Sequence, residues 1–299
     1  MELFTTVGTT LEGPNGRYRV IKEVARGGMG AVYRAEDLTH QRYVAIKEAC
    51  LDPVACEGKR DQIRARLLHE MRILKPLSHP CIPRIFDQFS SHNNEYLVME
   101  FIEGQTLMQI QQRTLRQKRL LEEPRVLGWL IQVLDALDYL HTRPQPIIHR
   151  DIKPENLILT PDGRVMLVDF GLMKQVEEQL SETGPLTEAT GTVEYAPPEQ
   201  YAQSGASTDA RSDIYSLGAT FYYLLAGRLP PRSVDRMMPL SIDVTRKPPS
   251  LRKINPTVSA RTEQVIFKAL EVDPEHRYQS AAQMRRALLP PRRFILLPF

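Results

Sequence analysis

The sequence predicts an α+β fold in which strands come first and helices follow. Apolar and polar residues alternate from Tyr18 to Val24 and again from Ala31 to Ala35, as they do in half-buried strands. Further along the chain, apolar residues recur at helical spacing, which predicts helices from Arg125 to His141, from Ile214 to Leu225, and twice between Arg261 and Leu289. We therefore expect a small β-rich part followed by a larger helical part.

The composition is that of an ordinary globular protein. The 299 residues are 42% hydrophobic and 25% charged, and the net charge of +3 gives no reason to expect a nucleic-acid partner. The cysteines, Cys50, Cys56 and Cys81, form no Cys-x-x-Cys pair, which supports neither a disulfide framework nor a zinc site and favours a reducing cytosol. No apolar run approaches the roughly 18 residues of a membrane helix, so we expect a soluble chain without a membrane segment.

A glycine-rich loop, Gly27-Gly28-Met29-Gly30, stands between the first two predicted strands. A Rossmann loop would precede a helix, and a P-loop would contain Gly-Lys-Ser or Gly-Lys-Thr, so neither nucleotide-binding motif fits. Residues without a Cβ atom let backbone N–H groups approach phosphate oxygens. The loop is interpreted as a flexible hairpin lid over phosphates, and a turn that needs positive φ is the alternative.

Two opposite charges occupy positions where apolar residues are expected. In Val44-Ala45-Ile46-Lys47, alternation places Lys47 on the same face as Ala45. In a helix expected from about Asp61 to Leu77, Glu70 falls in the middle of the apolar stripe. A carboxylate there needs a partner, and pairing with Lys47 would satisfy both groups. The alternative is that each charge reaches solvent along its own stem.

The stretch His149-Arg150-Asp151-Ile152-Lys153-Pro154-Glu155-Asn156, followed by Asp169-Phe170-Gly171, predicts a phosphoryl-transfer centre. Two apolar runs flank the turn Thr160-Pro161-Asp162-Gly163, a pattern typical of a hairpin. Asn156 and Asp169 are therefore expected at the two ends of one ribbon, where amide and carboxylate oxygens suit Mg²⁺ held against phosphate. Asp151 lies beyond them, free to take a proton.

These motifs resemble those of the eukaryotic-type (Hanks-type) protein kinases, and Lys153 followed by proline resembles the serine/threonine branch. The Gly-Gly-Met-Gly motif is most similar to that of the bacterial members of this kinase family. The resemblance covers roughly Tyr18 to Leu288. It implies the two-lobed protein-kinase fold: an N-terminal extension (1–17), a small antiparallel β lobe with one helix (18–103), a larger mainly helical lobe (104–289) and a C-terminal tail (290–299). The hinge would lie near Glu100 to Gly104, after a buried strand from Tyr96 to Met99.

The resemblance also implies a role for each matching residue. Asp151 would accept the proton of the substrate hydroxyl, and Lys153 would steady the transferred phosphoryl group. Asn156 and Asp169 would hold Mg²⁺, with Mn²⁺ as an alternative metal. Lys47, paired with Glu70, would hold the α and β phosphates of ATP. The nucleotide-binding residues would be Ala25, Gly27, Gly28, Gly30, Val32, Ala45, Lys47, the gatekeeper Met99, and the backbone of Glu100 and Ile102.

The polar segment from Lys174 to Glu194 is expected to be mobile and to carry regulation. A phosphate there could pair with the guanidinium of Arg150, so Thr187 and Thr190 are hypothesised to be autophosphorylation sites, modified in trans within a homodimer. An ordinary Ser/Thr-rich surface loop is the alternative. The resemblance implies structural roles for four further residues: Thr192 bonded to the catalytic loop, Asp213 bracing its backbone, and Glu199 paired with Arg277.

The sequence thus predicts a cytoplasmic serine/threonine protein kinase that transfers the γ-phosphoryl group of Mg-ATP to protein hydroxyls. Two positions depart from the family pattern: Ala25 replaces the first loop glycine, and Pro197 stands where Ala-Pro-Glu has alanine. A scaffold that works by protein interaction without transfer is one alternative. A small-molecule phosphotransferase is the other, and it is disfavoured by Lys153 and by the Thr-bearing segment that ends in Glu199.

Overall fold

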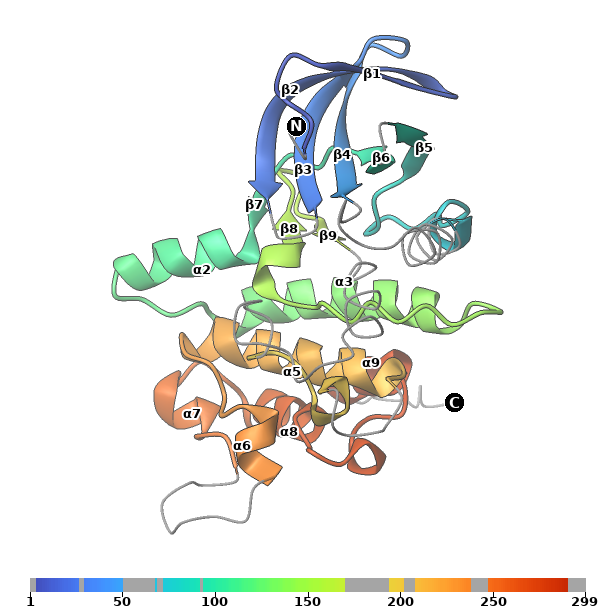
Figure 1. Cartoon of the computed structure of the whole chain (residues 1–299). Coiled ribbons are helices and arrows are strands. Elements are labelled where there is room, and N and C mark those ends of the chain that lie inside the picture. Colours follow the sequence, from blue (N-terminus) through green and yellow to red (C-terminus); the bar gives the residue numbers. More distant parts are fainter. Residues whose placement is uncertain are drawn as a thin grey trace, which may run out of the picture. The chain divides into compact units, whose positions relative to one another are not determined.

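The computed structural model describes residues 4–26, 30–50, 68, 72–91, 94–169, 194–201, 208–237 and 247–289 (Figure 1). These residues fall into two compact units. The first contains residues 4–104 together with 160–169, and the second contains 105–159 together with 194–289. The division between residues 104 and 105 lies at the end of the expected hinge.

The first unit is built on a six-stranded sheet with the spatial order β1-β2-β3-β4-β6-β5. Neighbouring strands pair in antiparallel fashion. The sheet contains the four predicted strands, now bounded as β2 (Gly16–Arg26), β3 (Gly30–Asp37), β4 (Arg42–Cys50) and β6 (Asn94–Glu100). Two edge strands were not predicted, β1 (Thr10–Gly13) and β5 (Ile85–Ser91).

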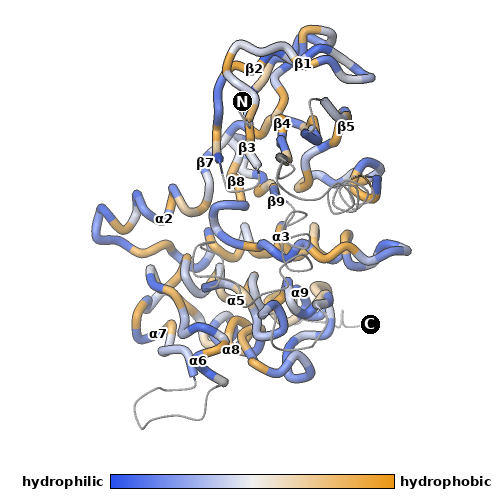
Figure 2. The backbone as a smooth tube through the Cα atoms, in the orientation of Figure 1, coloured by the Kyte–Doolittle hydropathy of each residue, from blue (hydrophilic) through white to orange (hydrophobic). Residues whose placement is uncertain are grey.

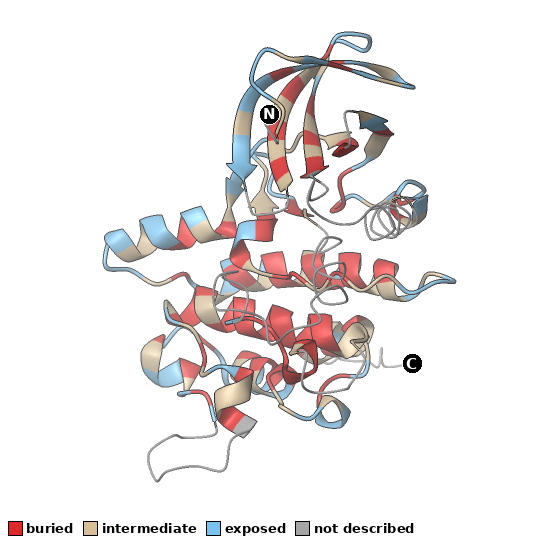
Figure 3. Ribbon diagram, viewed as in Figure 1, coloured by how far each residue is buried: buried red, intermediate tan, exposed pale blue. Residues whose placement is uncertain are grey.

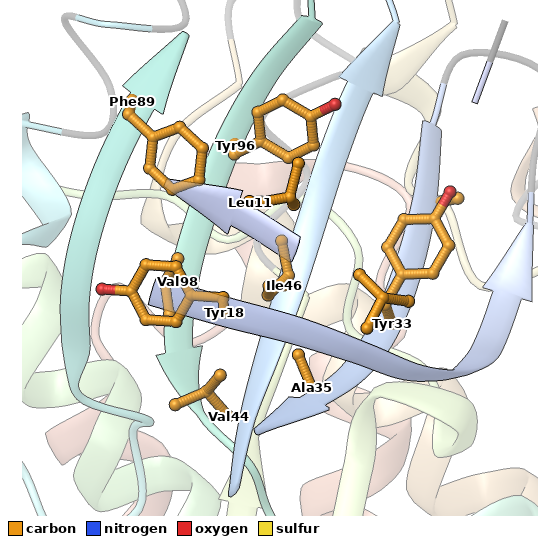
Figure 4. Close-up of a cluster of buried hydrophobic side chains, with 11 residues drawn as sticks. Leu11, Tyr18, Tyr33, Ala35, Val44, Ile46, Phe89, Tyr96 and Val98 are labelled. Carbon is orange, nitrogen blue, oxygen red and sulfur yellow. The ribbon is translucent and has the colours of Figure 1, made fainter. Parts of the chain in front are cut away.

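The core of the first unit covers one face of this sheet (Figure 4). Val44 and Ile46 of β4 point into it, as the alternation predicts. The ring of Phe89 stacks on Tyr18 and on Tyr96, with centroids 6.0 and 5.1 Å apart. These stacked rings fill the space between β2, β5 and β6 and add specific contacts to the burial of apolar area.

A buried carboxylate, Glu48 of β4, ties the N-terminal segment into this core. Glu48 accepts hydrogen bonds from the hydroxyl groups of Tyr33 (2.6 Å) and Tyr96 (2.7 Å) and from Nδ2 of Asn94 (2.7 Å). Thr5 adds its backbone N–H (3.0 Å) and its hydroxyl (2.8 Å). Burial raises the pKa of Glu48, but these hydrogen bonds outweigh it and hold the pKa below its ordinary value.

A second buried carboxylate, Asp87 of β5, joins the two edges of the sheet. It accepts hydrogen bonds from the backbone N–H of Asn15 (2.9 Å), from the Asn15 side chain (3.0 Å) and from the Tyr18 hydroxyl (2.8 Å). Strand β1 contacts β5 at this point, so the sheet curls toward closure. Thr5 and strand β1, both within the expected N-terminal extension, therefore take part in the sheet and its core.

The second unit is mainly helical, as predicted. Its helices are α2 (Leu107–Arg116), α3 (Glu123–His141), α5 (Ala210–Ala226), α6 (Ser233–Met237), α7 (Leu251–Ile254), α8 (Ala260–Ala269) and α9 (Ala281–Leu288). Short strands β7 (Gln105–Thr106) and β8 (Leu157–Leu159) pair with each other. Three single turns of 3-10 helix complete it: η1 (Pro154–Asn156), η3 (Pro198–Gln200) and η4 (Pro274–His276).

Among the described helices of the second unit, α5 has the most buried residues and α3 the next most (Figure 3). Hydrophobic and hydrophilic segments alternate along α3 (Figure 2), which gives it one face for the core. Helix α5 begins at a capping box in which the Asp209 side chain accepts the Arg211 N–H. It ends at Gly227, whose φ of 69° is the left-handed conformation that favours glycine.

The predicted turn after the catalytic loop forms, with Thr160 N–H donating to the Arg164 carbonyl oxygen at 2.9 Å. The following strand, β9 (Val165–Leu167), groups with the first unit, although residues 104–289 were expected to form one lobe. The reason is a backbone hydrogen bond from Leu167 N–H to the Cys81 carbonyl oxygen (2.8 Å). The chain thus returns to the first unit immediately before Asp169.

Most of the helix expected from Asp61 to Leu77 lies outside the described residues, although residues 72–74 are helical. Across the ranges that the structure describes, no helix has both the length and the apolar composition needed to cross a membrane.

Candidate active site

One face of the first unit's sheet carries the predicted nucleotide-binding residues. In the strand register, Val32 lies opposite Lys47, and Ala45 lies opposite Met99. Residues directly opposite each other, or two apart on one strand, share a face, so these four side chains lie together. They are half-buried, whereas Ile46 between them is fully buried in the core. The arrangement is an apolar surface with one ammonium group at its end. Ala25, at an exposed position of β2, pairs with Val32.

Lys47 forms an ion pair with Asp169, between Nζ and Oδ1. The side chains are 18% and 42% exposed, so a ligand can reach both. Asp169 has a φ of 58°, which is sparsely populated for residues other than glycine and is found preferentially at functional sites. The expected partner of Lys47, Glu70, lies outside the described residues.

Two backbone N–H groups of the expected hinge differ in their hydrogen bonding. The N–H of Glu100 donates to the Arg84 carbonyl oxygen (2.8 Å), which fixes the end of β6. Within the described part of the chain, the N–H of Ile102 donates no hydrogen bond. This donor is therefore available to a ligand, and an adenine ring nitrogen would serve.

In the second unit, the catalytic loop folds back on itself through η1. The carboxylate of Asp151, which is 4% exposed, accepts a hydrogen bond from Nδ2 of Asn156 (2.9 Å) and contacts Nζ of Lys153 (3.0 Å). Nδ2 of Asn156 also donates to the Asp151 carbonyl oxygen (2.8 Å). Both bonds use the amide nitrogen, so the amide oxygen is the atom that can bind a cation.

Asp213, fully buried at the start of α5, braces the backbone of this loop as the resemblance implies. It accepts the N–H groups of His149 and Arg150, both at 2.8 Å, and Nε2 of His141, also at 2.8 Å. Burial raises the pKa of Asp213, but the hydrogen bond and charge of His141, together with the charge and backbone N–H of His149, outweigh it and lower the pKa. Arg150 is held there with a φ of 63°, a left-handed conformation that is uncommon for residues other than glycine.

Sequence reasoning missed three residues that fix the loop. His141 ends α3 and bonds Asp213; Thr220 of α5 donates to the Ile152 carbonyl oxygen (3.2 Å); Gln200 donates to the Arg150 carbonyl oxygen (3.2 Å). Only Thr220 gave a signal, because it is a polar residue inside an apolar helix. The other two bond partners that are distant in sequence, which no local pattern indicates.

The expected pair of Glu199 and Arg277 is present and buried. The two side chains form a bidentate contact with distances of 2.6 and 3.0 Å. Arg277 is 1% exposed, and its guanidinium also donates to the carbonyl oxygens of residues 211, 271 and 272. The contact fixes η3, from which Gln200 reaches the catalytic loop.

Several residues predicted for the site lie outside the described ranges: Gly27, Gly28, Glu70, Thr187, Thr190 and Thr192. Gly30 is described, and the space around it is tight. A Cβ atom there would lie 2.5 Å from the backbone oxygen of Glu48. The pairing of β3 with β4 thus requires glycine at this position, independently of any phosphate.

The comparisons with known proteins agree with this geometry. A family model described as "Protein kinase domain" matches residues 18–288. The chain is 34% identical over 275 residues to the probable serine/threonine-protein kinase SCO3848 of Streptomyces coelicolor, covering 90% of this chain and 39% of that protein. It is 32% identical over 288 residues to the serine/threonine-protein kinase PknB of Mycobacterium tuberculosis, covering 94% and 44%. The chain thus spans about two-fifths of the length of these relatives.

Solved structures show the same architecture. The apo form of PpkA-294 matches with a TM-score of 0.74 and 24% identity, over 96% of this chain and 100% of that chain. The kinase domain of PknI from Mycobacterium tuberculosis matches with a TM-score of 0.67 and 26% identity, over 95% and 98%. The fold is therefore the two-lobed protein-kinase fold. The chain belongs to the protein kinase domain family, and it is a Hanks-type domain of the kind that bacterial serine/threonine-protein kinases carry.

Proposed function

We propose that this chain transfers the γ-phosphoryl group of Mg-ATP to serine and threonine hydroxyl groups of proteins. One observation carries the proposal: the nearly buried carboxylate of Asp151 is held between Asn156 and Lys153 on a loop whose backbone is fixed by Asp213. A carboxylate oriented in this way can accept a proton at a fixed position, which is what a general base requires.

In the proposed reaction, the substrate hydroxyl gives its proton to Asp151 as its oxygen bonds to the γ-phosphorus. The bond from that phosphorus to the bridging oxygen breaks, and ADP leaves with the bonding electrons. Lys153, 3.0 Å from Asp151, steadies the negative charge of the transferred group. Most of the catalysis is then positioning and charge neutralisation.

Asn156 and Asp169 would hold the metal ion. An amide oxygen and a carboxylate are hard ligands that suit Mg²⁺, with Mn²⁺ as an alternative, and such sites are completed by phosphate and water oxygens. The ion would neutralise the charge of the phosphates. Lys47, now paired with Asp169, would then turn to the α and β phosphates.

The nucleotide would lie against the half-buried face of the first unit. Val32, Ala45 and Met99 would contact the adenine ring, and the backbone of Glu100 and Ile102 would bond its edge. The loop that contains Ala25, Gly27, Gly28 and Gly30 would cover the phosphates. The available N–H of Ile102 supports this assignment.

Regulation would act through autophosphorylation of Thr187 and Thr190, in trans between two copies, with the phosphate paired to Arg150. Thr192 would bond the catalytic loop. The substrates would be cytoplasmic proteins, because ATP is supplied there.

The proposal is tested by incubating the purified chain with Mg-ATP and measuring intact and peptide masses. Phosphate on Thr187 or Thr190 is expected in the parent and not in Asp151→Asn. Mixing Asp151→Asn with a catalytically active, mass-tagged copy should restore its phosphate if transfer occurs in trans. Absence of phosphate on the parent and on generic protein substrates, with either Mg²⁺ or Mn²⁺, would favour a scaffold instead.

A further inference from the structure

Arg34 of β3 is a half-buried cation with an unusual environment in the first unit. Its side chain lies on the same half-buried face as Val32. Its Nε atom is buried, and among the described residues that atom has no hydrogen-bond partner. No carboxylate of the described ranges pairs with its guanidinium. A charge placed in this way is costly unless something else stabilises it.

Two aromatic rings supply that stabilisation. The guanidinium carbon lies 4.1 Å from the ring centroid of Tyr43 and 5.0 Å from that of Phe101. Both distances are within the range of cation–π attraction, and the planar guanidinium is suited to stacking between rings. Tyr43 is half exposed, so the inner partner is Phe101.

Phe101 stands between the two hinge residues whose backbone is assigned to adenine. On one side, Glu100 is already fixed through the carbonyl oxygen of Arg84, and the backbone N–H of Arg84 donates to the Glu100 side chain (3.3 Å). On the other side, Ile102 presents its available N–H. The conformation of the peptide units around Phe101 therefore decides where that N–H points.

We propose that Arg34 is a positioning residue for nucleotide recognition: its guanidinium links the Phe101 ring to the Tyr43 ring and so fixes the hinge backbone from the sheet side. In this proposal Arg34 acts through the Phe101 ring and not on the reacting atoms. This inference rests on the proposed function in one respect, namely that the Glu100 to Ile102 backbone binds adenine. It predicts that losing the cation weakens nucleotide binding and leaves the chemical step intact.

The test measures the dissociation constant of ADP by calorimetry, and KM for ATP and kcat by phosphate transfer. Arg34→Leu removes the cation and keeps most of the aliphatic stem, and we expect both the dissociation constant and KM to rise about three- to tenfold, with kcat within about twofold. Phe101→Leu should do the same. The double variant should bind ADP no more weakly than the single variant with the lower affinity, because the two residues act through one contact.

The matched control is Arg19→Leu on the neighbouring strand β2. Arg19 is exposed and pairs with Glu36 at 2.5 Å, and among the described residues it contacts no aromatic ring, so ADP binding should be unchanged. Arg34→Lys keeps the charge without the planar stack, and its ADP affinity should lie between those of the parent and Arg34→Leu. If Arg34→Leu does not fold, Arg34→Lys and Tyr43→Leu carry the test, and both should weaken ADP binding.

An unchanged ADP dissociation constant in Arg34→Leu would overturn the inference. So would a lower melting temperature with unchanged affinity, since that marks a purely structural contact, and so would additive effects in the double variant. ADP binding can be measured whether or not the chain transfers phosphate. A parent that binds ADP but transfers no phosphate would contradict the kinase proposal, while the binding comparison would still decide the role of Arg34.

Discussion

Arg277 uses every N–H group of its guanidinium inside the second unit, on Glu199 and on backbone carbonyl oxygens. Ser212 adds a hydrogen bond to the same Glu199 carboxylate (2.8 Å). A buried pair that is satisfied in this way is stable as a pair, but each partner depends on the other. Removing one leaves the opposite charge buried and unpaired.

Arg277→Met should therefore lower the free energy of unfolding by about 3 to 5 kcal/mol. Arg285→Met is the matched control, because its pair with Asp135 (2.7 Å) is 41% and 50% exposed and should be worth less than about 1 kcal/mol. Urea denaturation of both variants measures the difference. Equal decreases in the free energy of unfolding of the two variants would mean that burial does not strengthen the dependence on the Glu199–Arg277 pair.

Glu48 predicts a dependence of stability on pH. Its folded pKa lies below the ordinary 4.5, so as pH falls the unfolded chain binds the proton first. The stabilisation from Glu48 is therefore complete above about pH 4.5 and is lost as pH falls through the folded pKa. In Glu48→Gln the free energy of unfolding should fall less steeply with decreasing pH than it does in the parent. Glu12→Gln, at an exposed position, should leave the parent's profile unchanged, and the same slope in both variants would contradict the account.

Strand β1 was not predicted from the sequence, yet it contributes to the core of the first unit. Its Leu11 is 5% exposed and lies beside Tyr18 and Phe89 in the core (Figure 4). Leu11→Ala should lower the free energy of unfolding by about 2 to 5 kcal/mol through lost burial and the cavity left behind. Val7, 61% exposed in the same segment, provides the control, since Val7→Ala should change it by less than about 0.5 kcal/mol. A neutral Leu11→Ala in thermal or urea denaturation would show that β1 is dispensable.

Two glycines in different elements should respond to alanine with opposite signs. Gly30→Ala places a methyl group against the Glu48 backbone oxygen and should destabilise the β3–β4 pairing by about 1 to 3 kcal/mol. Gly128→Ala, inside α3 with nothing within 4 Å, should stabilise the chain by about 0.5 to 1 kcal/mol. Chemical denaturation gives both signs. Stabilisation by Gly30→Ala would mean that the strands can separate at no cost.

At the scale of the whole molecule, the sequence predicted the elements that carry strong local patterns. Alternation located β2, β3 and β4, a short apolar run located β6, and helical patterns located α3, α5, α8 and α9. It did not locate β1 and β5. Residues Thr10–Gly13 are too few for a periodic signal, and Asn15, which follows them, is held by Asp87, 72 residues further along the chain.

The candidate site was predicted better than its support. The motif residues Asp151, Lys153 and Asn156 do meet, because η1 is a local turn. Three supporting features depend on contacts between distant segments. They are the grouping of residues 160–169 with the first unit, the bond from His141 to Asp213, and the contact of Arg34 with the Phe101 ring. No spacing in the sequence encodes such contacts. They can be recognised only after the fold is known.

The most direct test of the central claim is steady-state phosphate transfer by Asp151→Asn, which keeps the hydrogen-bonding shape but cannot accept the proton. We expect kcat to fall about 10²- to 10⁴-fold, with KM for ATP within about twofold of the parent. Asp162→Asn, in the exposed hairpin turn, should retain parental kcat. An Asp151→Asn variant that keeps more than about a tenth of parental kcat would contradict the assignment of Asp151 as the general base.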